Sequence, residues 1–293
     1  DTAEAIRAAL IEAGFDAGMI NIAPFYADTL RMGLEKGADV FTILMRTSQP
    51  EDAAAFEQWS TTLSESMRVY RVTPKAETPV NAYAYPALTP RGTGVHEVQS
   101  LPEADKALDQ IRQSLIAQYG GEYDYEEFSA RIAVPEGMTG YLNDENAQGD
   151  NRDTSYLMTN DFTLNSDEDF VVVYGVNHVA AGKATYANTV LYARPRLNGI
   201  VSLYDSMYGD SAAEYLPDVD SSKYYVLKMA RTALDSHTAV IPYSTDNPNG
   251  RFYGADNGTQ LLIAYRAYVE PETGVGPSYY EIVYDRAIVF HKK

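Results

Sequence analysis

The sequence predicts an α+β protein in which an N-terminal α/β segment with a βαβ-like unit precedes an antiparallel β-sandwich or jelly-roll-like C-terminal part. Two observations lead to this prediction. Helical periodicity is concentrated in the first 121 residues, where one helix is flanked by strand-like runs. From Tyr123 onward, short alternating segments follow one another between turn residues. We therefore place two domains at residues 1–121 and 122–293.

The first element is a short amphipathic helix over residues 1–13. Asp1 is a candidate N-cap with Glu4 three residues later, and Gly14 stands just past the end. The two side chains can accept hydrogen bonds from the unpaired amides of the first helical turn. Glycine after the last turn can adopt the left-handed conformation that ends many helices. The apolar positions that recur at helical spacing are Ile6, Ala9, Leu10 and Ala13.

A βαβ-like unit follows. Residues 39–47 are almost continuously apolar, as in a strand that is buried on both faces. Ser48 and Glu51 then form a capping-box pattern with Pro50 in the first turn, which predicts that a helix starts there. The alternating residues 67–72 predict the second strand.

A third helix is predicted after Ser100 and Glu103, which repeat the capping pattern of Ser48 and Glu51. One face of this helix is apolar throughout, and Gly120 and Gly121 end it. The residues on that face are Ala104, Leu108, Ile111, Leu115 and Tyr119.

The remainder of the chain reads as strands separated by turns, which favours an antiparallel sandwich or barrel. The candidate strands are residues 130–134, 155–159, 169–176, 183–193, 199–204, 223–231, 238–243, 259–269 and 279–290.

Residues 177–183 are expected to join two of these strands as a hairpin. A catalytic hypothesis makes His178 a general base, lets Asn177 orient a ligand, and uses Lys183 or Tyr186 to stabilise developing charge. The alternative is an ordinary polar hairpin loop, since no serine or aspartate partner is placed by the sequence.

Residues 143–153 suggest a calcium loop. Asp144 and Asn146 occupy the first and third positions of the calcium-loop pattern, but Ser155 stands where an EF-hand needs glutamate. The pattern therefore disfavours an EF-hand, and leaves two alternatives: an irregular Ca²⁺ site formed by Asp144, Asn146, Asp150 and Asp153, or a solvated acidic loop. No other cofactor is required.

Charged residues also fall on apolar strand faces. Asp205 and Arg286 are expected either to pair as a structural ion pair or to line a ligand site. Arg266, Tyr268 and Glu270 lie together on the face opposite the apolar residues of their strand, which is exposed to solvent or to a ligand.

Composition limits the partners. The chain has 41 acidic and 23 basic residues and a formal net charge of −18, which argues against nucleic acid and acidic membrane surfaces as partners. The absence of cysteine excludes disulfides, thiolate metal sites and cysteine nucleophiles. No apolar run is long enough to span a bilayer, so membrane insertion is not expected.

The predicted function is an exported or cell-surface binding or assembly module, extracellular or periplasmic. The 24 tyrosines, concentrated in the β half, provide a surface for a glycan polymer or a protein partner. Two alternatives remain open: a hydrolase or lyase with a cleft between the two parts that uses His178, and a shell subunit that self-associates. No nucleotide-binding or metalloprotease signature is present.

Overall fold

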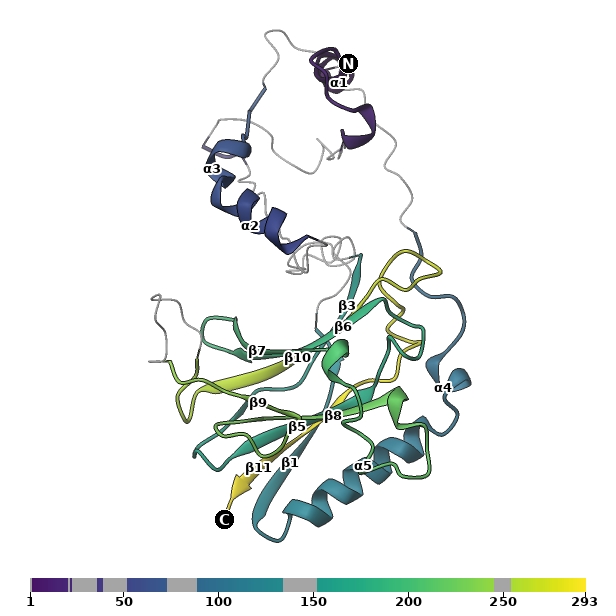
Figure 1. Cartoon of the computed structure of the whole chain (residues 1–293), viewed down its shortest axis with the longest axis vertical. Coiled ribbons are helices and arrows are strands. Elements are labelled where there is room, and N and C mark those ends of the chain that lie inside the picture. Colours follow the sequence, from purple (N-terminus) through teal and green to yellow (C-terminus); the bar gives the residue numbers. More distant parts are fainter. Residues whose placement is uncertain are drawn as a thin grey trace. The chain divides into compact units, whose positions relative to one another are not determined.

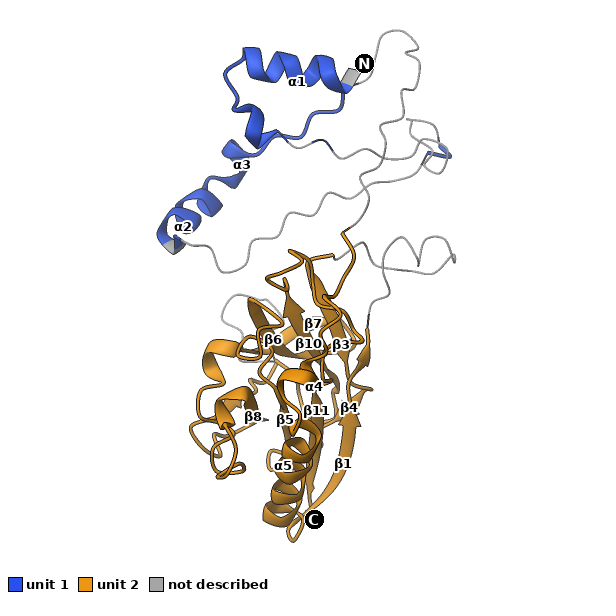
Figure 2. Cartoon of the chain, turned by 90° about the vertical axis from the view of Figure 1, so that its right-hand side faces the viewer, with its two compact units in different colours: residues 1–87 blue, residues 88–293 orange. Residues whose placement is uncertain are grey.

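The chain consists of two compact units. The computed structural model describes residues 2–20, 22, 36–38, 52–72, 89–133, 152–244 and 254–293. The first unit spans residues 1–87 and the second spans residues 88–293 (Figure 2). The domain boundary expected at residue 121 lies inside the second unit, because the helix before it packs on a strand of that unit.

The described part of the first unit is helical. It comprises α1 (Thr2–Glu12), the 3-10 turn η1 (Ala17–Met19), α2 (Ala53–Thr61) and α3 (Leu63–Ser66). The helix predicted at residues 1–13 is confirmed as α1, and Gly14 follows it with a positive φ of 96°.

The start and surroundings of α2 differ from the prediction. The N-cap is Asp52, whose side chain accepts a hydrogen bond from the amide of Ala55 at 2.9 Å. Ser48, Glu51 and the strand expected at residues 39–47 lie outside the described residues. Residues 67–72 form no strand, and Val69 and Tyr70 are 74% and 79% exposed. Alternating apolar residues alone therefore did not produce a strand here.

The second unit opens with α4 (Glu97–Ser100) and α5 (Ala104–Tyr119). The apolar face predicted for α5 is confirmed, since Leu108, Ile111 and Leu115 are fully buried. The expected cap is wrong: Ser100 ends α4, and Glu103 occupies the N-cap position without a side-chain hydrogen bond to the first amides of α5.

Two sheets make up the rest of this unit, as the α+β prediction with a sandwich-like C-terminal part requires (Figure 1). The first sheet has the order β1 (Tyr123–Ser129), β11 (Arg286–Lys292), β5 (Phe170–Val176), β8 (Tyr224–Ala230), β9 (Thr238–Val240). The second has the order β2 (Arg131–Ile132), β3 (Thr154–Met158), β10 (Gln260–Tyr268), β6 (Tyr186–Ala193), β7 (Asn198–Tyr204), and β4 (Phe162–Thr163) also pairs with β10. Short 3-10 turns η2 (Asp205–Met207) and η3 (Ser221–Lys223) follow β7 and precede β8.

The pairing is antiparallel throughout these sheets except between β8 and β9, which are parallel. β1 and β4 were not predicted. β1 is rich in acidic residues and lies at a sheet edge, where charge is tolerated and discourages pairing with another chain.

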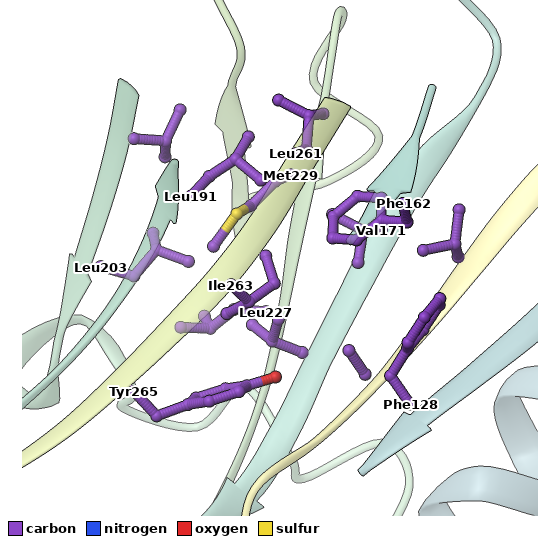
Figure 3. Close-up of a cluster of buried hydrophobic side chains, with 14 of the residues drawn as sticks. Phe128, Phe162, Val171, Leu191, Leu203, Leu227, Met229, Leu261, Ile263 and Tyr265 are labelled. Atoms are coloured by element: carbon purple, nitrogen blue, oxygen red, sulfur yellow. The ribbon is translucent and has the colours of Figure 1, made fainter. Parts of the chain in front are cut away.

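β5 lies at the centre of the fold and is buried on both faces. Val171 and Val173 face the core between the two sheets, which Figure 3 shows in close-up. Phe170 and Val172 belong to a second core on the side of α5. The layers are therefore α5, the five-stranded sheet and the six-stranded sheet. Each fully buried valine or phenylalanine contributes about 1.5–3 kcal/mol to this arrangement.

The connection at residues 177–183 is not a hairpin. β5 belongs to the five-stranded sheet and β6 to the six-stranded sheet, so this segment crosses from one sheet to the other. The last strand also starts later than expected, at Arg286, and residues 279–285 form turns and irregular structure. No helix in the described part of the chain is long and apolar enough to cross a membrane.

Candidate functional site

His178 lies in a buried cluster of charged side chains. It is 4% exposed, and its Nδ1 atom lies 2.7 Å from Oε1 of Glu97. On the other side of the ring, Nε2 lies 3.7 Å from Oδ2 of Asp285. Oε2 of Glu97 accepts a hydrogen bond from the amide of Val283, and Oδ1 of Asp285 accepts one from the hydroxyl of Tyr225.

This environment keeps His178 protonated. Burial alone would lower the pKa of His178, but the charges and hydrogen bonds of Glu97 and Asp285 outweigh burial and raise that pKa to about 10. A general base needs an unprotonated nitrogen that reaches its substrate. The geometry therefore favours an ion pair that holds the fold together over the proposed role in proton abstraction.

Lys183 forms a second cluster of the same kind. Its Nζ atom lies 2.6 Å from Oε1 of Glu270, 2.7 Å from Oε2 of Glu281 and 3.2 Å from Oγ1 of Thr93. Burial lowers the pKa of Lys183, but the hydrogen bonds to the two carboxylates have the larger combined effect and raise it. Glu281 also accepts bonds from the amides of Thr93 and Gly94. Two cations and four carboxylates thus fix residues 92–97 to the sandwich.

The other two members of the proposed catalytic set lie elsewhere. Asn177 caps the start of the crossing segment, where its Oδ1 accepts a hydrogen bond from the amide of Ala180 at 3.2 Å. Tyr186 lies on the outer face of the six-stranded sheet. Its hydroxyl accepts a hydrogen bond from Asn188, whereas His178 and Lys183 bond to buried glutamates.

The expected pairing of Asp205 with Arg286 is wrong. Nη2 of Arg286 lies 3.4 Å from Oδ1 of Asp105 on α5, whereas Asp205 accepts a hydrogen bond from the amide of Ala187 at 3.1 Å. The two residues belong to strands and turns of different sheets, which the alternation pattern does not reveal.

Three of the four proposed calcium ligands, Asp144, Asn146 and Asp150, lie outside the described residues. The backbone carbonyl of the fourth, Asp153, accepts a hydrogen bond from the amide of Val269 at 2.8 Å. Among the residues that the structure describes, no group of three or more histidine, cysteine or acidic side chains could hold a metal ion.

The outer face of the six-stranded sheet gathers the remaining candidates. On β10, Arg266 is directly opposite Tyr156 of β3 and Asn188 of β6, and Tyr268 is opposite Tyr186. Alternate residues of β10 and β6, among them Ile263, Tyr265 and Leu191, point into the core, so these side chains face away from it. We call Tyr156, Tyr186, Asn188, Tyr192, Arg266 and Tyr268 the tyrosine–arginine face.

Arg266 is the centre of this face. Its guanidinium donates to Oδ1 of Asn188 at 3.1 Å and to the hydroxyl of Tyr192 at 2.6 Å. The guanidinium carbon also lies 5.2 Å from the ring centre of Tyr156 and 5.4 Å from that of Tyr192. Contacts of this kind are favourable by about 0.5–2 kcal/mol and hold the side chain in one place.

Two smaller apolar residues lie between the tyrosines of this face. Val190 and Ala264 are paired at the middle of the outer face and are each only 7% exposed. Beside them, Tyr186 and Tyr268 bring their ring centres within 5.3 Å. All six side chains of the tyrosine–arginine face are partly exposed.

Part of this face was predictable from the sequence. The alternation along residues 186–192 places Tyr186, Asn188 and Tyr192 on one side of a strand, and the structure confirms it. The contribution of Tyr156 was missed, as was the buried Glu97, because neither residue has a sequence neighbour that indicates its partner. Only strand pairing brings Tyr156 beside Arg266.

Comparison with known proteins adds a partial similarity. No family model matches the chain. It is 30% identical over 111 residues to the probable ribonuclease FAU-1 of Pyrococcus horikoshii and, to the same extent, to that of Pyrococcus abyssi. The aligned part is 36% of this chain and 22% of each relative, so the chain matches about a fifth of the length of these ribonucleases.

Proposed function

We propose that this chain binds single-stranded RNA on the tyrosine–arginine face and serves as the RNA-binding part of a protein that hydrolyses RNA. The observation that carries the proposal is the position of Arg266, which is held between the rings of Tyr156 and Tyr192 on the outer face of the six-stranded sheet. The partial similarity to probable ribonucleases supports the same ligand class.

The chemistry of this face suits unpaired bases. Proteins bind single-stranded nucleic acid by stacking the bases on aromatic side chains and on arginine, often on the surface of a sheet. The face has four tyrosine rings around one guanidinium. A double helix keeps its base faces stacked internally and cannot use such a surface, so we expect single strands to bind in preference to duplexes.

The net charge of −18 has a specific consequence for this proposal. The expectation that nucleic acid is excluded rested on the charge of the whole chain, whereas the proposed site has one cation and no carboxylate among its six members. Repulsion from the rest of the molecule will weaken binding. Since few phosphates are neutralised, affinity should depend only weakly on salt, with a slope of about −1 or less in magnitude.

A glycan polymer is the second candidate ligand of the same face. The acidic charge of the chain favours it, because a neutral polysaccharide is not repelled, and tyrosine rings pack well against sugar rings. The second proposal is therefore an exported module that binds a glycan on this face, and the binding experiment described next tests both ligands.

The experiment is fluorescence anisotropy of the whole chain with labelled RNA single strands, RNA duplexes and soluble glycans. We expect the single strand to bind and Tyr192→Ala to weaken it about 5- to 100-fold, which corresponds to about 1–3 kcal/mol for a stacked base. Arg112→Gln is the matched charge control, because Arg112 pairs with Glu127 on the far side of the unit. Binding of glycan but not RNA would overturn the proposal in favour of the second candidate.

A further inference from the structure

We propose that the tyrosine–arginine face selects guanine over adenine among the unpaired bases of its RNA ligand. This inference rests on the proposed function and specifies its substrate class. The argument depends on the direction of the hydrogen bonds around Arg266.

Arg266 itself determines which group donates and which accepts in these hydrogen bonds. A guanidinium has five N–H donors and no acceptor, so the atom of Asn188 that faces Arg266 has to be the carbonyl oxygen. The amide nitrogen of Asn188 must then point the other way, where it lies 3.0 Å from the hydroxyl of Tyr186 and donates to it. Tyr192 likewise accepts from Arg266 through its hydroxyl oxygen.

Both tyrosine hydroxyls therefore act as acceptors within the face. Each keeps its own proton, and within the described part of the chain neither hydroxyl donates to a protein group. Arg266 uses two of its five donors on Asn188 and Tyr192, and in the described part of the chain the other three donate to no protein group. The face consequently presents several donors around one cation and few acceptors.

A ligand edge with adjacent acceptors complements this surface. Guanine has O6 and N7 side by side, and arginine commonly binds both at once. Adenine has an amino group in place of O6, so a donor would meet a donor there. Stacking on tyrosine does not distinguish the two purines, so hydrogen bonding alone should decide between them.

The test compares three oligonucleotides of about twelve nucleotides, a length within the usual range of such sites. They alternate uridine with guanosine, adenosine or inosine, and each competes for the whole chain in an anisotropy assay. We expect the guanosine and inosine strands to bind about tenfold tighter than the adenosine strand. Inosine is informative because it keeps O6 and N7 but lacks the second amino group of guanine.

Two variants test the assignment to these hydroxyls. The double variant Tyr186→Phe with Tyr192→Phe keeps both rings and should reduce the guanosine preference to about twofold while binding to the adenosine strand stays within twofold. Asn188→Asp offers only acceptors, so the Tyr186 hydroxyl should turn inward and donate to it, and the preference should fall as well.

The outcomes separate the two proposals. Equal binding of all three strands by the wild-type chain would overturn the guanine preference and leave RNA binding intact. A preference that survives both variants would overturn the assignment to the hydroxyl network. No binding to any strand would overturn the proposed function itself, and circular dichroism of each variant confirms that the fold is retained.

Discussion

Nδ1 of His178 lies 2.7 Å from Oε1 of Glu97, although the two residues are 81 positions apart in the chain. Residue 97 begins α4, and residue 178 lies in the segment that crosses between the two sheets. The ion pair therefore fixes the start of α4, which precedes α5, to the connection between β5 and β6. It explains a histidine in a buried connection, where a neutral polar loop would have been unstable.

Replacing His178 should destabilise the chain strongly. His178→Gln leaves Glu97 and Asp285 buried without their cation, and breaking one side of a buried ion pair costs about 3–5 kcal/mol. Urea unfolding followed by circular dichroism measures this loss. His291→Gln is the matched control, since His291 pairs with Asp169 but its side chain is 30% exposed, and it should cost clearly less. Equal losses in the two variants would contradict the assigned importance of the buried pair.

The same pair predicts a loss of stability at alkaline pH. The pKa of His178 is raised in the folded state from 6.5 to about 10 by its two carboxylates, which outweigh burial. Its contribution is therefore fully present below pH about 6.5 and is lost as the pH rises through about 10. The free energy of unfolding should fall over this range by more in the wild type than in His178→Gln. If the free energy of unfolding fell equally with pH in the two proteins, His178 would not be the source of the alkaline loss of stability.

Asp169 predicts the opposite dependence at acid pH. Burial would raise the pKa of this carboxyl, but bonds from Ser166, His291 and two backbone amides lower it from 3.8 to about 2. Its contribution, about 2 kcal/mol, is present above pH about 3.8 and is lost as the pH falls through about 2. Asp169→Asn should remove this acid slope in urea unfolding. Asp210→Asn, at a side chain that is 85% exposed, should leave the slope unchanged.

Two glycines in the segment that carries this network provide a test of close packing. Both have positive φ, 88° at Gly92 and 81° at Gly94, so alanine costs about 1 kcal/mol at either position. At Gly92 a Cβ atom would also lie 2.5 Å from the Glu281 carboxylate, whereas at Gly94 nothing lies within 4 Å. Gly92→Ala should therefore destabilise the chain by about 1–3 kcal/mol more than Gly94→Ala, which lowers the melting temperature by about a further 2–12 °C. The reverse order would show that Glu281 moves aside freely.

The sequence by itself determined the class of the fold and the faces of its elements. The apolar spacing of α5 and the unbroken apolar run of β5 reflect burial, because the local spacing of apolar residues indicates which faces of an element are buried. The same alternation placed Tyr186, Asn188 and Tyr192 on one side of β6. The acidic net charge and the lack of cysteine also follow directly from the sequence.

Only the tertiary structure decided which strands are neighbours. A period of two residues shows which way a side chain points but not which strand lies beside it, so β5 and β6 looked like a hairpin although they belong to different sheets. Asp205 and Arg286 looked like partners for the same reason, and each found another group. The pairing of β3 with β10, which puts Tyr156 over Arg266, and the meeting of His178 with Glu97 are set by the packing of the whole core. That packing depends on contacts between distant residues, which no local pattern encodes.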